Sequence, residues 1–342
     1  MLSVFQRGNS RESLRARWPA VAVLALAVLM LGTVMGCNPS AQAPKVVRIG
    51  YLETSGAAPT TSVVEAFRRG LRDNGWEEGR NLSIELRFAE GNEARLPILV
   101  RELLDLHVDL IFAATTQATR ETLDATSTIP VVFAGLADPV GAGIVKDPSH
   151  PGGNATGTSL MTAHLHGRQL QLLKESVPSL SRVAVLLNPT GPSASSLDLL
   201  EDAAAAVGIQ PLVLRVNTME EVATSLDRAV TQGAGAVIAL PDALFFNERP
   251  RMIRLAAERS LPDMYWERTF VEDGGLMSYG GNRAEAFRRA TGYVDKILKG
   301  ARPGDLPVEQ SSQFEFLVGT AAQQRLGITI PPAVAEEVTE WV

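Results

Sequence analysis

Short apolar runs rich in β-branched residues alternate with longer stretches of helical periodicity along the chain from Val46 onward. This alternation is typical of parallel α/β sheets, in which a crossover helix follows each strand. In the first half, apolar residues at helical spacing predict two helices with buried faces at Val64, Phe67 and Leu71 and at Leu99, Val100 and Leu103. The strands expected in this half cover residues 46–52, 82–90, 109–115 and 130–135.

The second half of the sequence repeats the plan of the first. Thr218 and Glu221 have the spacing of a capping box, which predicts a helix start between the middle two of the four strands in this half. The strands expected here cover residues 182–188, 209–216, 235–241 and 262–267. Two halves with the same order and spacing predict an α/β fold of two doubly wound, Rossmann-like lobes.

The last part of the chain breaks this symmetry. A strand at 274–280 precedes a helix capped by Asn282 with Glu285, and residues 306–318 are extended again. We expect the chain to return to the first lobe and cross back, which makes a multi-crossover hinge with crossings near 156–160, 270–276 and 305–309. This assigns residues 46–157 and 275–306 to an N-terminal lobe, and residues 158–274 and 307–342 to a C-terminal lobe.

Polar residues gather where the expected strands end. Open α/β sheets bind ligands beyond the carboxyl ends of their strands, so two facing lobes would share one cleft. Tyr51 and Tyr279 lie on strands and could stack on a ligand there, or belong to the core or rim. For each polar residue the alternative is a helix or turn cap. The polar candidates are Thr54, Ser55, Thr115, Thr116, Gln117, Asp138, Asn188, Thr190 and Asp242.

The N-terminus has the pattern of an export signal. A basic segment ends at Arg17, an apolar run follows, and the stretch 34–37 (Val-Met-Gly-Cys) resembles the lipobox of bacterial lipoproteins. We expect a signal peptide at 1–36, a lipid on Cys37, and a polar tether at 37–45. A retained transmembrane helix is the alternative, because the apolar run is about long enough to span a bilayer.

Composition excludes several classes of protein. The formal net charge is −6, and four of the 32 basic residues lie in the expected signal, so the remaining chain is more acidic still. An acidic chain without a basic stripe argues against a nucleic-acid partner. The single cysteine excludes an intramolecular disulfide.

The sequence lacks the common motifs of enzymes and cofactor-binding proteins. No phosphate loop or dinucleotide fingerprint occurs, so no cofactor is expected and no catalytic residue is assigned. His164 and His166 would need a third ligand to hold a metal, and we expect them to be surface residues before a helix.

Several stretches together resemble a known family. They are 48–52, 70–92, 109–119, 129–145, 151–159, 296–310 and 326–332. In order and spacing they are similar to the ABC transporter substrate-binding family that includes tryptophan- and tyrosine-binding lipoproteins. The resemblance runs from about residue 47 to 332 and implies the type 1 periplasmic-binding fold.

What the resemblance implies is a binding protein and not an enzyme. It would capture a small polar solute, such as an amino acid, by lobe closure and deliver it to an ABC permease and its ATPase. The chain is expected to be an exported monomer, anchored by lipid and facing the periplasm or cell exterior. A lipoprotein sensor that signals without transport, and an enzyme on the same fold, are the alternatives.

Overall fold

The computed structural model of the chain describes residues 46–58, 60–191 and 193–342. The expected signal peptide at 1–36, the lipidated Cys37 and the tether at 37–45 lie outside the described residues. Within the described part of the chain, no helix combines the length and the apolar character needed to cross a membrane.

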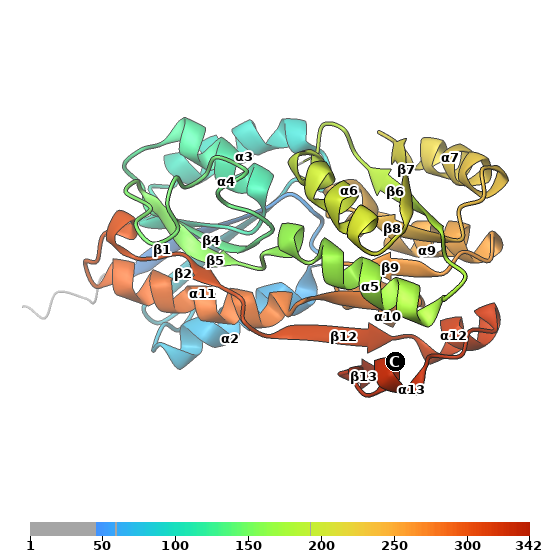
Figure 1. The fold of residues 1–342 in the computed structure, drawn as a ribbon. Coiled ribbons are helices and arrows are strands. Elements are labelled where there is room, and N and C mark those ends of the chain that lie inside the picture. Colours follow the sequence, from blue (N-terminus) through green and yellow to red (C-terminus); the bar gives the residue numbers. More distant parts are fainter. Residues whose placement is uncertain (1–45, 59, 192) are drawn as a thin grey trace, which may run out of the picture. The chain divides into compact units, whose positions relative to one another are not determined.

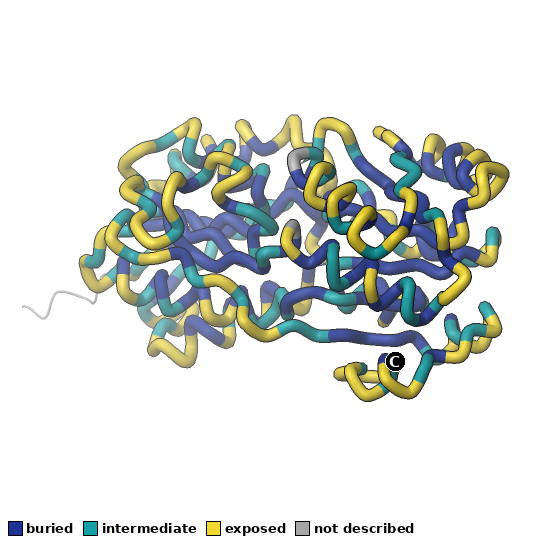
Figure 2. The backbone as a smooth tube through the Cα atoms, viewed as in Figure 1, coloured by how far each residue is buried: buried dark blue, intermediate teal, exposed yellow. Residues whose placement is uncertain are grey.

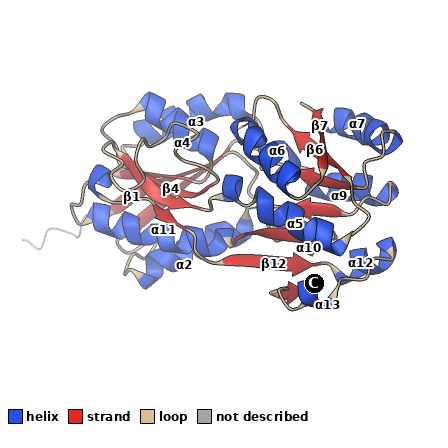
Figure 3. Cartoon of the chain, in the orientation of Figure 1, coloured by secondary structure: helices blue, strands red, loops and turns tan. Residues whose placement is uncertain are grey.

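The first lobe is built on a six-stranded sheet with the order β11-β5-β4-β3-β1-β2, in which all neighbours run parallel. Helices α2 and α11 cover one face, and α3 and α4 cover the other (Figures 1 and 3). The strands are β1 (Val47–Glu53), β2 (Leu82–Phe88), β3 (Leu110–Ala113), β4 (Val131–Leu136), β5 (Ala155–Ser159) and β11 (Glu309–Gln310). The helices are α2 (Thr61–Asp73), η1 (Glu93–Arg95), α3 (Leu96–Asp105), α4 (Thr116–Ala125), α11 (Arg283–Leu298) and η4 (Pro303–Asp305).

The second lobe has a seven-stranded sheet with the order β13-β12-β10-β9-β8-β6-β7, in which only the β10–β12 pair is antiparallel. Its strands are β6 (Arg182–Leu187), β7 (Gln210–Arg215), β8 (Ala236–Ala239), β9 (Asp263–Tyr265), β10 (Met277–Gly281), β12 (Phe314–Val318) and β13 (Glu340–Trp341). One face carries η2 (Thr162–His164), α5 (His166–Ser176), η3 (Ala194–Ser196), α6 (Leu197–Ala206), α12 (Thr320–Leu326) and α13 (Pro332–Ala335). The other carries α7 (Met219–Thr231), α8 (Ala243–Asn247), α9 (Arg249–Glu258) and α10 (Thr269–Glu272).

The two sheets share one strand order. Their first five strands are arranged β2-β1-β3-β4-β5 and β7-β6-β8-β9-β10, the flavodoxin-like doubly wound pattern. The predicted fold class is therefore confirmed. Strand β5 was not expected, because its sequence, Ala-Thr-Gly-Thr-Ser, has no apolar run that would indicate a strand. Thr156 and Thr158 on this strand donate to the carbonyls of Leu306 (2.8 Å) and Ala286 (3.2 Å), so the buried hydroxyls are satisfied.

Three connections join the lobes, at residues 160–161, at residue 282 and at residues 311–313. The expected second crossing near 270–276 is too early, because β10 pairs with β9 and β12 in the second sheet. The segment 277–281 thus belongs to the second lobe, and Glu309–Gln310 to the first. Apolar spacing reveals a strand but not the sheet edge at which it pairs. In the first connection Met161 has φ of +52°, a conformation that is costly outside glycine.

The sheets and inward helix faces form the core (Figure 2). All six residues predicted to line the buried faces of α2 and α3 are buried. The predicted caps also form, since the Thr218 hydroxyl accepts from the Glu221 amide (3.3 Å) and Asn282 Oδ1 accepts from the Glu285 amide (2.8 Å). His166, by contrast, was expected at the surface and is only 2% exposed.

Candidate functional site

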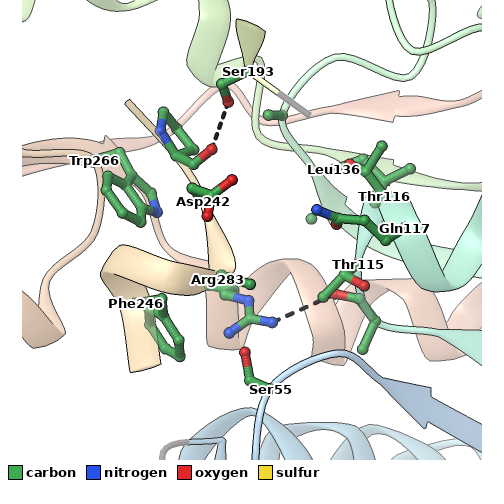
Figure 4. A pocket seen from close by; sticks show the side chains of 15 residues that line it. Ser55, Thr115, Thr116, Gln117, Leu136, Ser193, Asp242, Phe246, Trp266 and Arg283 are labelled. Carbon is green, nitrogen blue, oxygen red and sulfur yellow. Dashed lines mark hydrogen bonds between the residues drawn. The ribbon is translucent and has the colours of Figure 1, made fainter. Parts of the chain in front are cut away.

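A cavity of about 110 Å³ lies between the carboxyl ends of strands from both lobes (Figure 4). The first lobe contributes the ends of β1, β3 and β4, and the second contributes the loops after β6, β8 and β9. In each sheet this is the point where the strand order reverses, the usual ligand position in doubly wound folds. The lining residues are Ser55, Ala114, Thr115, Thr116, Gln117, Gly135, Leu136, Ala137, Ser193, Pro241, Asp242, Ala243, Phe246, Trp266 and Arg283.

Asp242 is the acidic residue in this cavity wall. Its Oδ1 accepts from the Leu244 amide (2.8 Å), which caps α8, and from Asn188 Nδ2 (3.3 Å). Its Oδ2 is buried and has no hydrogen-bond partner. A Cβ at Gly191 would lie 2.0 Å from Oδ2, so only glycine leaves room for this carboxylate. An unpartnered buried oxygen is costly, which favours a ligand donor at this atom.

Electrostatics agree with that interpretation. Burial raises the pKa of Asp242. The hydrogen bonds from Leu244 and Asn188 lower this pKa, but they do not cancel the effect of burial. Burial, and after it repulsion from Asp242, raises the pKa of Glu93 in the first lobe. Two carboxylates that repel each other across the cleft create a negative potential in which a cationic group would be stabilised.

Arg283 supplies the opposite charge at the start of α11. Its Nη2 donates to Glu53 Oε2 (3.0 Å) and, more weakly, to the Ala114 carbonyl (3.4 Å). Glu53 is fully buried, and burial raises its pKa although the guanidinium opposes this. Burial disfavours the charged form of Arg283 as well. Attraction to the carboxylate of Glu53, and second to that of Glu267, nevertheless raises the pKa of Arg283. Arg283 in the cavity wall and the buried Glu53 behind it therefore form a salt bridge.

Aromatic rings form the second-lobe side of the cavity. The guanidinium of Arg283 lies 5.3 Å from the centroid of Phe246, and the ring of Trp266 meets Phe270 edge-on at 4.6 Å. Figure 4 places Trp266 and Phe246 opposite Thr115, Thr116 and Gln117. The arrangement offers an apolar surface beside a charged pair, as in many small-molecule sites.

Hydroxyl-bearing residues contribute to the side of the cavity that the first lobe forms. Thr54 and Thr115 share a hydrogen bond of 2.6 Å between their hydroxyls, and Thr115 caps α4 by accepting from the Ala118 amide (3.2 Å). Gln117 Nε2 donates to Glu93 Oε1 (2.9 Å). The positive N-terminal end of α4 therefore borders the cavity beside Thr116.

Five of the predicted site residues line the cavity together, and the others do not. Tyr51 is fully buried in the first-lobe core, where its ring stacks on Phe112. Tyr279 packs near Phe314 and Phe316 in the second lobe. The five that line it are Ser55, Thr115, Thr116, Gln117 and Asp242.

The remaining polar candidates serve local structure. Asp138 Oδ1 accepts from the amides of Val140 (3.1 Å) and Gly141 (2.8 Å), which closes a turn. Asn188 Oδ1 accepts from the Thr190 amide (3.1 Å) and hydroxyl (3.0 Å). Thr54 does not line the cavity, but its hydroxyl is hydrogen-bonded to that of Thr115, which does. In the same way, Asn188 donates a hydrogen bond to Asp242.

The sequence interpretation missed Arg283, Phe246 and Ser193. Arg283 did carry a signal, because a cation at the first position of a helix opposes the helix dipole. A residue that is unfavourable for its own helix is expected at positions where function requires it. Among the described residues, no cluster of three or more histidine, cysteine, aspartate or glutamate side chains could hold a metal ion.

Comparisons with known proteins agree with this architecture. The chain is 25% identical over 283 residues to a tyrosine-binding protein of Clostridioides difficile strain R20291, covering 82% of this chain and 81% of the relative. The crystal structure of a conserved domain protein from Vibrio cholerae superposes with a TM-score of 0.82 at 28% identity, covering 87% of this chain and all of that one. An ABC domain from Streptococcus pneumoniae in complex with L-Trp gives 0.80 at 24% identity, covering 86% and 99%.

The family assignment rests on a match to most of the chain. The model of the family described as "ABC transporter substrate binding protein" matches residues 56–342, which include the second lobe, the first lobe apart from β1, and every lining residue except Ser55. The chain therefore belongs to the ABC transporter substrate binding protein family.

Proposed function

We propose that this chain captures a small solute with a cationic amino group, such as an amino acid or a related compound, in the cavity between its lobes. The observation that carries the proposal is the buried, unpartnered Oδ2 of Asp242 in the cavity wall. An ammonium group there would gain a charge-assisted hydrogen bond of about 1.5–3 kcal/mol.

The opposite side of the cavity suits the other end of a zwitterion. Arg283 and the start of α4 bring positive potential to the first-lobe side, while Asp242 brings negative potential to the second. Phe246 and Trp266 would flank the remainder of the solute. The tyrosine-binding relative and the structure with L-Trp support an amino acid as the class of solute.

We further propose that a lipid on Cys37 anchors the protein outside the cytoplasm, where it delivers the solute to an ABC permease and its ATPase. A binding protein of this kind closes around its solute as two rigid lobes and leaves it chemically unchanged.

Solute capture can be tested by a thermal-shift screen of the twenty amino acids and of tyramine, which has the amine of tyrosine without its carboxylate. A solute at 100 times its dissociation constant should add about 2.7 kcal/mol to the free energy of unfolding. Native mass spectrometry should then find a one-to-one complex with the unmodified solute. Absence of any complex, in the screen and in gently purified protein, contradicts capture, and conversion of the solute to a product supports an enzyme instead.

Anchoring can be tested in cells. Since Gly36-Cys37 closes the apolar run, the wild-type protein should incorporate labelled fatty acid and begin at residue 37. Cys37→Ser should abolish both, whereas Ser40→Ala in the tether should leave both intact. Unlipidated wild-type protein together with a Cys37→Ser variant still cut after Gly36 would show that the anchor is wrong.

A further inference from the structure

The two lobes touch where the end of α8 meets the loop after β2. Gly91 lies in that loop, and its amide donates to the Thr54 carbonyl of the first lobe (2.8 Å). A Cβ placed on Gly91 would lie 2.9 Å from Nδ2 and 3.8 Å from Cγ of Asn247, the last residue of α8, and within 4 Å of no other described residue beyond its chain neighbours. The side-chain amide of Asn247 therefore rests against the bare Cα of Gly91.

Backbone hydrogen bonds fix the loop that carries Gly91. The Ala89 amide donates to the Glu53 carbonyl (2.9 Å), and the Asn92 amide donates to the Ala89 carbonyl (3.0 Å), so the loop is held at the end of β1. Gly91 itself has φ of +77°, in the left-handed region that favours glycine. Glycine thus meets two requirements at this position, the backbone conformation and the close approach of Asn247.

The same end of α8 makes a second contact with the first lobe. Phe246, next to Asn247, is 7% exposed, and the guanidinium groups of Arg249 and Arg283 lie 4.8 and 5.3 Å from the centroid of its ring. Arg249 belongs to the second lobe, but Arg283 is held in the first by its salt bridge with Glu53. Adjacent residues of one helix therefore meet the first lobe at two points.

The contact between Asn247 and Gly91 is one of fit and not of hydrogen bonding. Asn247 Oδ1 is buried and has no hydrogen-bond partner among the described residues. Burying this oxygen without a donor costs free energy, so the contact does not draw the lobes together. It instead limits their approach, because the side-chain amide and the glycine backbone cannot come closer.

Neither residue of this contact belongs to the cavity wall. The lining of the cavity includes Asp242 and Phe246, at the cap and within α8, but not Asn247 or Gly91. The separation at which Asn247 meets Gly91 therefore determines how near the α8 side of the cavity lies to the first-lobe side (Figure 4). The contact would act on a solute only through the width of the cleft.

We propose that Gly91 and Asn247 are positioning residues for solute capture, which stop the closing lobes at the separation that fits the solute. This inference rests on the proposed function, because capture by lobe closure gives the contact its role. A side chain in place of Gly91 should hold the lobes apart and weaken capture, although it reaches no solute. Removing the Asn247 amide should make room for that side chain and restore capture.

Crosslinking of the full chain tests the contact without any solute. When Gly91→Cys is combined with Asn247→Cys, a sulfur at the position of Asn247 Cγ starts 3.8 Å from the other Cβ, so a small shift gives disulfide geometry. Oxidised glutathione should therefore link the pair, and peptide mass spectrometry identifies the disulfide. Gly79→Cys with Asn247→Cys is the matched control, because Gly79 has a similar φ of +80° and no described atom lies within 4 Å of a Cβ there. Absence of the link in the first variant, or an equal yield in the control, overturns the proposal.

Calorimetry with L-tyrosine measures the role of the contact in capture. Asparagine tolerates the left-handed region, but in Gly91→Asn its side chain overlaps the Asn247 amide, so affinity should fall about 5- to 150-fold. Adding Asn247→Ala should restore the affinity to within about threefold of the wild type, and Gly79→Asn alone should leave it unchanged. Unchanged affinity in Gly91→Asn, or no recovery with Asn247→Ala, overturns the proposal. Failure of L-tyrosine to bind the wild type counts against the proposed solute class alone, since the crosslink decides the contact separately.

Discussion

Arg283→Met is expected to lower the free energy of unfolding by about 3–5 kcal/mol, because it leaves the fully buried carboxylate of Glu53 without its cation. Methionine keeps much of the volume of the arginine stem, so packing against Phe246 and Phe287 changes little. Urea denaturation measures the loss. Arg288→Met on the same helix breaks only surface pairs and should stay within about 0.5 kcal/mol of the wild type.

The same variant should show a characteristic pH dependence. Burial already raises the pKa of Glu53 in the presence of Arg283, and removing the guanidinium raises it further. A carboxyl with a raised folded-state pKa destabilises the fold at high pH, and this cost disappears as pH falls through that pKa. The defect of Arg283→Met should therefore be smaller at pH 5 than at pH 8.

A double substitution separates charge from packing. Glu53→Gln added to Arg283→Met removes the unpaired charge, so the double variant should be more stable than Arg283→Met at pH 8. If Arg283→Met is no less stable than Arg288→Met, or if Glu53→Gln gives no recovery, the buried pair does not hold this part of the cleft together.

The fold was largely predictable because its determinants are local and periodic. The inward face of α2, with Val64, Phe67 and Leu71, follows from helical spacing, and the caps at Thr218 and Asn282 follow from short-range pairs. The sheet that a strand joins depends on long-range pairing, which spacing does not encode. For that reason β10 was assigned to the wrong lobe, and β5, with two buried threonines, was overlooked.

The cavity was only partly predictable for a related reason. Strand ends identify which loops meet, and this rule found Thr116 and Asp242. It does not distinguish a side chain that faces the cavity from one that closes its own turn, as Asp138 does. The rule also omits residues that do not directly follow a strand. Arg283 begins α11, after a crossover between the lobes, and Phe246 lies within the short helix α8.

Asp242→Asn is expected to weaken binding of an amine-bearing solute by roughly 10- to 150-fold, the equivalent of a charge-assisted hydrogen bond of about 1.5–3 kcal/mol. The amide can keep its oxygen at Oδ1, so the cap on the Leu244 amide and the fold should survive. Asp242→Ala should lose the same affinity and, in addition, about 1 kcal/mol of stability from the missing cap.

Calorimetry with the best solute of the thermal-shift screen decides the role of this carboxylate. Asp138→Asn is the matched control, because Asp138 also accepts backbone amides after a strand but does not line the cavity. Because burial raises the pKa of Asp242, wild-type affinity should fall as pH drops toward that pKa, and Asp242→Asn should lack this component. Unchanged affinity in a folded Asp242→Asn variant would mean that Asp242 only caps α8 and that the amino group binds elsewhere.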